Sequence, residues 1–234
     1  MTESFSSPNY DERPHGVNVD ILLLHYTGMP TAQEALEALC DPAREVSAHY
    51  FIYENGKTLA LVPEERRAWH AGKAYWRGHR DINARSIGIE LVNPGHEWGY
   101  QDFPAAQMDA LVELAKGILK RNPVPARNVL AHSDVAPARK QDPGHRFDWG
   151  RLAREGVGLW AGQEGVEFPP PSPDLGNADA FRRDLECFGY DPDVPPDIAA
   201  TAFQRHYRPW RIDGNADVES HRILRKLIAM AQES

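Results

Sequence analysis

Hydrophobic and polar residues follow two different patterns along the first 160 residues of the chain. Some apolar runs are continuous and have the length of a strand, as in a sheet that is buried on both faces. Other apolar positions recur every three or four residues, which is typical of an amphipathic helix. The predicted strands cover 17–27, 85–93 and 127–133, with a hairpin over 49–62, and the predicted helices cover 31–40 and 103–121. This alternation predicts an α/β domain, in which helices pack on a sheet.

Local signals support three of these elements. Thr31 and Glu34 have the spacing of a capping box, which predicts the start of the first helix. Pro104 suits the first turn of the second helix. The dipeptide Asn55-Gly56 favours the tight turn of a hairpin.

The pattern changes after residue 160. The segment 161–176 is rich in proline and glycine, which predicts an extended linker rather than a helix or a central strand. Three amphipathic segments follow, and their apolar positions are Phe181, Leu185 and Phe188, then Ile198, Ala202, Phe203 and Tyr207, then Val218, Leu224, Leu227 and Ile228. Three short helices of this kind can share one small core. We therefore predict an α/β domain over 1–160, a linker over 161–176 and a three-helix domain over 177–234.

Composition narrows the classes of function. The net charge of −8 argues against a protein that binds nucleic acid or anionic membranes without specificity. The two cysteines, Cys40 and Cys187, lie far apart, which excludes a disulfide framework and a cysteine zinc site. No run approaches the roughly 18 apolar residues of a membrane span. The given sequence shows no export signal, so we expect a cytoplasmic location. We also expect a monomer. A periplasmic or envelope location would follow if such a signal had been removed.

Polar residues stand where the predicted strands end. His25 and His132 each follow an apolar run, Glu90 lies inside a third, and Asp142 follows ten residues after His132. In open α/β sheets, ligands gather beyond the ends of strands. A single histidine at such a place is more often structural. Two histidines with a carboxylate nevertheless suit an open zinc site, although the chain has no compact HExxH motif.

The same region carries groups that suit hydrolysis assisted by a metal. A glutamate near a metal can take a proton from water and deliver one to a leaving amine. A lysine can stabilise the oxyanion that forms when a carbonyl is attacked. Glu90 and Lys140 are the candidates for these two roles. The alternative for Lys140 is a solvated lysine in a surface loop.

Five segments in order resemble the type 2 N-acetylmuramoyl-L-alanine amidase family. They are LLLHYTGM, VSAHYFI, RAWHAG, SIGIELVNPG and VLAHSDVAPARKQDPG, which together span roughly residues 10 to 160. The segment AFQRHYRP, followed by Asp213-Gly214, resembles a small three-helix peptidoglycan-binding domain. This two-domain layout is most similar to the bacterial amidase D subgroup. The resemblance implies a mixed central β-sheet flanked by helices.

The resemblance also implies roles for single residues. His25, His132 and Asp142 match the ligands of one zinc ion per chain, Glu90 matches the catalytic glutamate, and Lys140 matches the lysine that stabilises the transition state. The implied partners are peptidoglycan fragments, and the implied bond joins the lactyl group of N-acetylmuramic acid, or of its 1,6-anhydro form, to L-alanine.

Three further residues are weaker candidates for contact with substrate. Trp69 and His70 lie in a fragment that resembles part of the substrate groove, and Asn83 precedes the strand of Glu90. Trp69 could equally be a core aromatic, and Asn83 a turn residue. For His49 we favour a structural role, because a catalytic zinc with three protein ligands needs no fourth.

Two other classes of function compete with the enzyme. One is a recognition protein that binds peptidoglycan without cleaving it, and the other is a scaffold for wall enzymes that acts through the tail. The filled positions of the metal ligands and of Glu90 favour the enzyme.

Overall fold

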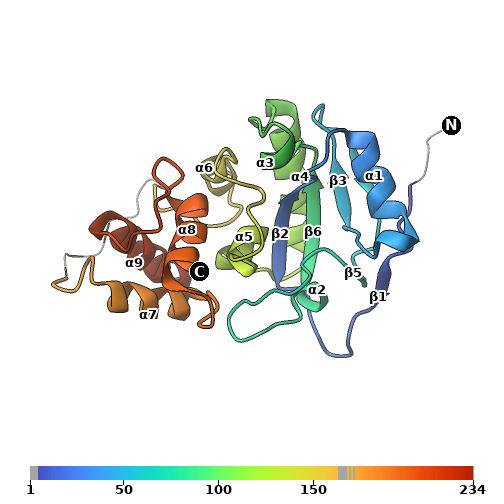
Figure 1. The fold of residues 1–234 in the computed structure, drawn as a ribbon. Helices are drawn as coiled ribbons and strands as arrows, with labels where there is room; N and C mark the ends of the chain where they lie inside the picture. The colour runs from blue at the N-terminus through green and yellow to red at the C-terminus, as the bar shows by residue number, and fades with distance from the viewer. Residues whose placement is uncertain (1–4, 163–167, 169, 171, 234) are drawn as a thin grey trace. The chain divides into compact units, whose positions relative to one another are not determined.

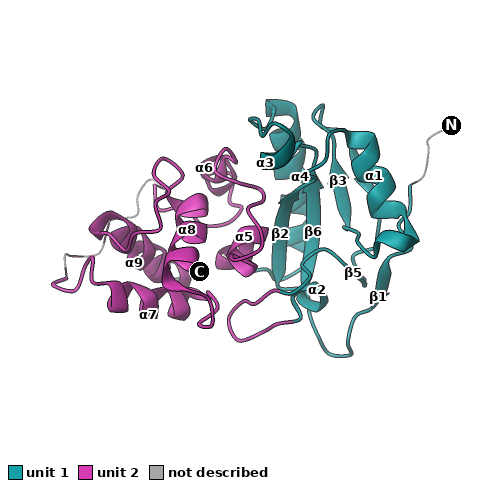
Figure 2. Cartoon of the chain, viewed as in Figure 1, with its two compact units in different colours: residues 1–73, 81–124 teal, residues 74–80, 125–234 magenta. Residues whose placement is uncertain are grey.

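A computed structural model of the chain describes residues 5–162, 168, 170 and 172–233. Its contacts divide the chain into two compact units, which Figure 2 colours separately: unit 1 holds residues 1–73 and 81–124, and unit 2 holds 74–80 and 125–234. The elements of unit 1 are β1 (Tyr10–Glu12), β2 (Ile21–Tyr26), α1 (Ala32–Cys40), η1 (Pro42–Arg44), β3 (Tyr50–Ile52), β4 (Thr58–Ala60), β5 (Arg66–Ala68), α2 (Ile82–Arg85), β6 (Ser86–Leu91), α3 (Gly95–Trp98) and α4 (Ala105–Arg121). Those of unit 2 are η2 (Ala126–Asn128), β7 (Val129–Ala131), α5 (His132–Val135), α6 (Trp149–Arg154), α7 (Ala178–Phe188), α8 (Pro196–Tyr207) and α9 (Val218–Glu233).

Unit 1 is built on a mixed sheet, as expected for this fold class (Figure 1). Its strands run in the order β4-β3-β6-β2. Strand β6 pairs in parallel with both β2 and β3, whereas β3 and β4 form an antiparallel hairpin. The first five residues of β2 are buried, which explains why its sequence is a continuous apolar run up to His25. A separate two-stranded ribbon, β1 with β5, has no clear signal in the sequence.

The local signals of the sequence are confirmed. Thr31 is the N-cap of α1, where its side chain accepts a hydrogen bond from the backbone N–H of Glu34. Pro104 stands at the N-cap of α4. The hairpin turns at Gly56, whose φ of +84° few other residues adopt at low cost. Helix α1 packs its apolar stripe, which includes Leu36, against Phe51 of β3.

The three predicted tail helices are α7, α8 and α9 of unit 2. The aromatic residues Phe181, Phe203 and Tyr207 are at most 2% exposed, so they form core, as the pattern predicts. Three positions of the predicted stripes differ. Ile198 and Ile228 are half-buried, and Val218, the first residue of α9, is 52% exposed.

An arginine organises the turn between α8 and α9. Arg208 is fully buried, and its guanidinium donates to carboxylates of Asp213, Asp217 and Glu219 at 2.7–3.2 Å. Three carboxylates around one buried cation offset the cost of removing its charge from water. The buried guanidinium of Arg208 therefore stabilises the acidic turn.

The compact units do not follow the boundaries expected from the sequence. Unit 2 takes up part of the predicted α/β domain together with the tail. The boundaries 1–160, 161–176 and 177–234 rest on the sequence pattern and stay predictions. Several residues of the expected linker lie outside the described part of the chain. Among the described residues, no helix has the length and apolar character to cross a membrane.

Candidate active site

His25 and Glu90 lie opposite each other on two adjacent strands. The parallel register pairs His25 of β2 with Glu90 of β6. Neighbouring strands run about 4.8 Å apart, and paired residues point to the same face of the sheet. The two side chains therefore emerge side by side, His25 almost fully buried and Glu90 half-buried.

A second histidine contacts His25. The Nε2 atom of His25 lies 3.0 Å from Nδ1 of His70, and the two rings meet edge to face. The Nε2 atom of His70 lies 3.2 Å from the hydroxyl of Ser86, which donates to the carbonyl of Ile82 at 2.7 Å. His70 is 9% exposed, so it belongs to the buried surroundings of His25.

His132 and Asp142 form the matching pair of unit 2. Their Nδ1 and Oδ2 atoms lie 3.0 Å apart, and both residues are buried. The backbone N–H of Ser133 donates to the carbonyl of Asp142, which ties the loop to the start of α5. His132 opens this short helix instead of ending the strand, so the predicted strand 127–133 is too long at its end.

These three residues could hold a metal ion together. Among the described residues, one ligand atom each of His25, His132 and Asp142 lies within 4.8 Å of the other two. Two ligands on one tetrahedral zinc stand roughly 3.3 Å apart, given bonds of roughly 2.0–2.1 Å. The separation of His132 and Asp142 is close to that value, so the donor set and its spacing fit the ion.

Lys140 lies in the loop between α5 and Asp142. Its backbone N–H donates to the carbonyl of Ala136 at 3.0 Å, and the residue is half-buried. The loop places Lys140 two residues before a candidate ligand. Its expected role as a cation near the reacting carbonyl stays a prediction.

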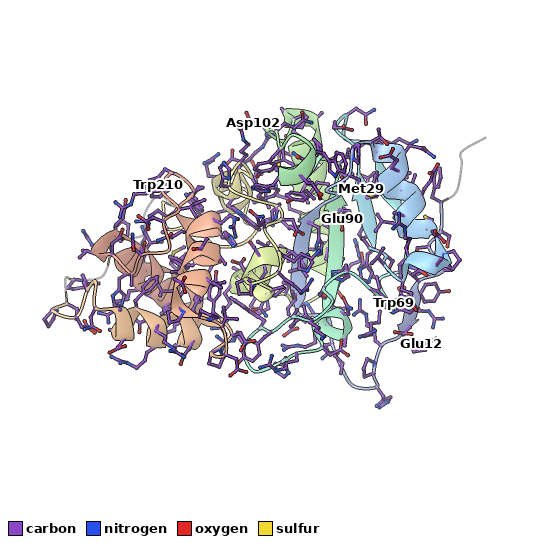
Figure 3. The ribbon with its side chains drawn as sticks, in the orientation of Figure 1. Glu12, Met29, Trp69, Glu90, Asp102 and Trp210 are labelled. Atoms are coloured by element: carbon purple, nitrogen blue, oxygen red, sulfur yellow. The ribbon has the colours of Figure 1, made fainter. Side chains whose placement is uncertain are left out.

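Trp69 and Asn83 both support the protein framework. The indole N–H of Trp69 donates to Asp11 at 2.7 Å, and Figure 3 shows Trp69 close to Glu12 and away from Glu90. The side-chain oxygen of Asn83 accepts hydrogen bonds from the backbone N–H groups of His70 and Ala71. Their expected contact with substrate stays a prediction.

His49 has the structural role that we favour from the sequence. Its Nδ1 accepts from the N–H of Gly88, and its Nε2 lies 3.0 Å from the carbonyl of Arg66. Burial lowers the pKa of His49 to about 4, opposed in part by its hydrogen bond to that carbonyl. The ring is therefore neutral at physiological pH and joins β6 to β5.

Unit 2 contains a buried polar cluster that sequence reasoning missed. The carboxylate of Asp134 lies 2.6 Å from Nδ1 of His206, and it accepts hydrogen bonds from Tyr190 at 2.6 Å and from the N–H of Ala131 at 2.8 Å. The His206 ring stacks on Trp149 at 3.6 Å. Burial, and then the charge of Asp134, raise the pKa of Tyr190, which keeps its hydroxyl protonated as a donor. Asp134 is two residues from His132, so tail residues brace the turn that carries a candidate ligand.

Unit 2 also has a cavity that is rich in aromatic side chains. It has a volume of about 580 Å³ and is lined by Trp160, Ala161, Gly162, Phe168, Tyr207, Trp210, Val218, Glu219, Arg222 and Ile223. Trp210, labelled in Figure 3, is 61% exposed, and its ring meets that of Trp160 edge to face. Glu219 accepts from the indole N–H of Trp210 at 3.3 Å. In the sequence, the only signal for this cavity is Trp210, a tryptophan next to the acidic turn of the tail.

Known proteins resemble the chain in sequence. The Amidase_2 family, described as N-acetylmuramoyl-L-alanine amidase, matches residues 15–145. The amidase AmiD of Escherichia coli (strain K12) is 38% identical over 233 residues, which cover 90% of this chain and 82% of AmiD. The 1,6-anhydro-N-acetylmuramyl-L-alanine amidase AmpD of Haemophilus influenzae is 34% identical over 163 residues, which cover 62% of this chain and 86% of AmpD.

Solved structures extend the similarity to nearly the whole chain. The complex of E. coli AmiD with anhydro-N-acetylmuramic acid-L-Ala-D-γ-Glu-L-Lys has a TM-score of 0.79 at 33% identity and covers 95% of this chain and 98% of its own. AMPDH3 of Pseudomonas aeruginosa, in complex with anhydromuramic pentapeptide, has a TM-score of 0.80 at 32% identity and covers 98% and 99%. Together with the family match, these relatives show that the chain belongs to the N-acetylmuramoyl-L-alanine amidases, a family of amide hydrolases.

Proposed function

We propose that the chain is a zinc-dependent amidase of muropeptides in cell-wall turnover or recycling. It hydrolyses the amide between the lactyl group of N-acetylmuramic acid, or of its 1,6-anhydro form, and L-alanine. The observation that carries the proposal is the buried group of His25, His132 and Asp142, with Glu90 opposite His25 in the sheet. The two relatives whose structures contain anhydromuramyl peptides support the substrate class.

The donor set favours zinc among the common metals. Two imidazoles and one carboxylate are borderline ligands that suit zinc, whereas calcium and magnesium prefer sites made of oxygen atoms alone. Zinc supplies Lewis acidity, which polarises a carbonyl and promotes the ionisation of water at neutral pH.

The side chains of this protein then carry the protons and the charge. Glu90 takes a proton from the attacking water, whose oxygen forms a bond to the lactyl carbonyl carbon. The same carboxyl group returns a proton to the nitrogen of L-alanine as the carbon–nitrogen bond breaks. Lys140 stabilises the negative charge that grows on the carbonyl oxygen.

Metal content and product analysis test the proposal together. The purified protein should contain about one equivalent of zinc, as a three-ligand site requires. Mass spectrometry after incubation with anhydromuropeptides should show free peptide that begins with L-alanine. His132→Ala should abolish both the metal and the products. Full activity after exhaustive chelation would contradict the role of the metal.

For the tail, we propose that the aromatic cavity binds the glycan part of longer wall fragments. Exposed tryptophan faces stack on sugar rings, and Glu219 and Arg222 offer an acceptor and donors for hydroxyl and acetamido groups. Trp210→Ala should weaken the sedimentation of the protein with intact sacculi and leave the cleavage of small muropeptides unchanged. Unchanged sedimentation would contradict this assignment. Trp98→Ala, which removes another exposed tryptophan outside the cavity, is the matched control.

A further inference from the structure

The hydroxyl of Ser86 fixes the proton positions of the two histidines beside it. The Ser86 oxygen lies 2.7 Å from the carbonyl oxygen of Ile82, and a carbonyl cannot donate. The hydroxyl hydrogen is therefore committed to Ile82, and the Ser86 oxygen can only accept from Nε2 of His70, at 3.2 Å. His70 thus carries its proton on Nε2.

The same argument extends one step further to His25. If His70 is protonated on Nε2, its Nδ1 atom in the neutral ring has only a lone pair. The Nε2 atom of His25, which lies 3.0 Å away, must then donate to it. This leaves Nδ1 of His25 unprotonated, which is the form of an imidazole nitrogen that binds a metal.

The backbone around His70 is built to seat its ring. Asn83 accepts from the N–H groups of His70 and Ala71, which fixes the chain at this point. Gly88 of β6 faces the ring so closely that a Cβ atom there would lie 2.5 Å from Nδ1 of His70. The backbone φ of Gly88 is not in the left-handed region, so it is contact with His70 that requires glycine here.

We propose that His70 is a positioning residue for His25. Through the chain Ile82–Ser86–His70–His25, it fixes the tautomer and the orientation of His25, and Gly88 provides the space for its ring. His70 thereby acts through His25 on the metal and need not touch the substrate. The proposal rests on the zinc site of the proposed function.

Metal affinity in three variants tests the proposal. Outer partners of metal ligands are typically worth 10–100-fold in affinity, so the zinc dissociation constant of His70→Ala should rise by about that factor. His70→Asn places an acceptor oxygen near the position of Nδ1 and should recover part of the loss. Gly88→Ala should also weaken zinc binding, although it changes no polar group. The affinities are measured by competition with a chromophoric chelator, after circular dichroism has confirmed folding.

A double variant separates positioning from general destabilisation. In His70→Ala, the space beside Gly88 is empty, so adding Gly88→Ala should cost no further affinity. Additive losses, or equal losses in His70→Ala and His70→Asn, would overturn the proposal. Leu36→Ala is the control, because it opens a cavity in the core beneath α1 and leaves this chain of hydrogen bonds intact. It should lower thermal stability without changing zinc affinity.

Nuclear magnetic resonance of the metal-free protein gives a readout that involves neither zinc nor activity. Long-range proton–nitrogen correlations should show His70 and His25 protonated on Nε2 alone. A proton on Nδ1 of His70 would overturn the proposal even if zinc binds. Absence of zinc binding in the unsubstituted protein, with the expected tautomers present, would instead contradict the proposed function and leave the hydrogen-bond chain standing.

Discussion

In unit 1, His25 and Glu90 take their positions from paired backbones, whereas in unit 2 His132 and Asp142 take theirs from buried side chains. Strands β2 and β6 place the first pair in register. The second pair stands on a four-residue helix and a loop, next to Asp134, which is bonded to Tyr190 and His206 from 56 and 72 residues away. Strand pairing depends on backbone hydrogen bonds, so it tolerates changes of side chain. A buried carboxylate that loses its hydrogen-bond donors is instead strongly destabilised. Distant substitutions should therefore disturb the site through unit 2 more than through unit 1.

The largest effect is expected for Glu90, where the strand holds the backbone and only the chemistry changes. Glu90→Gln keeps the shape but cannot accept a proton, so kcat should fall by about 10²–10⁴-fold. Bound zinc should stay at the level of the unsubstituted protein. Loss of zinc would make Glu90 a ligand and remove the distinction between the two pairs. Glu97→Gln, at an exposed glutamate of α3, is the control.

Lys140 tests whether the loop of unit 2 contributes chemistry as well as ligands. Losing one donor to an oxyanion typically costs about 10²–10³-fold in kcat, so Lys140→Ala should show this loss with KM little changed. Lys140→Arg should recover only part, because a guanidinium is planar and longer. Zinc content should be unchanged in both variants. A kcat near that of the unsubstituted protein would mean that Lys140 is a solvated lysine with no role in catalysis. Lys120→Ala, at an exposed lysine of α4, is the control.

The buried ring of His49 in unit 1 predicts a dependence of the free energy of unfolding on pH. His49 has a pKa of about 4 in the folded protein, below the ordinary value of 6.5. Between these values the unfolded chain binds a proton that the folded chain does not, so the free energy of unfolding falls as the pH drops from 6.5 towards 4. The loss reaches about 3 kcal/mol, at 1.36 kcal/mol for each pKa unit. The free energy of unfolding of His49→Gln, measured with urea at several pH values, should change less steeply with pH between 6.5 and 4. The same dependence on pH as in the unsubstituted protein would contradict the assignment.

The smallest effect is expected for the distant donor in unit 2. His206→Leu leaves the Asp134 carboxylate with one donor fewer, and zinc affinity should fall by about ten-fold, the lower end for partners outside the ligand set. His206→Asn keeps an N–H near Nδ1 and should recover part of the loss. Phe181→Leu disturbs the same helical core without touching Asp134, so it should lower stability alone. If Phe181→Leu weakens zinc binding as much as His206→Leu, the tail acts by general stability only.

The sequence predicts the longer elements of both units but not the contacts between side chains that lie far apart in the chain. The apolar runs around His25 and Glu90 predict their strands, because burial on both faces leaves a continuous pattern. The ribbon of β1 and β5 escapes prediction, since its three-residue strands are mostly exposed or half-buried. The helix that begins at His132 escapes as well, because four residues carry no periodicity.

The candidate metal ligands can be predicted from the sequence, whereas the residues that position them cannot. His25 and His132 stand out because each follows an apolar run, and Asp142 stands out because it is a carboxylate ten residues after His132. His70 stands out only as a histidine in a short fragment, and its contact with His25 depends on how β5, α2 and β6 pack. The partners of Asp134 come from a helix and a loop that no local pattern connects to it.

The buried guanidinium of Arg208 has a practical consequence for experiments with chelators. Asp213, Asn215, Asp217 and Glu219 alternate along the turn like the oxygen donors of a calcium-binding loop. In this turn, Asp213, Asp217 and Glu219 instead form ion pairs with the guanidinium of Arg208, which takes the place of a calcium ion. We therefore expect the structure of this turn not to depend on the calcium concentration. A chelator should therefore remove the proposed zinc ion and leave the tail helices folded, so that losses of activity after chelation report on the active site alone.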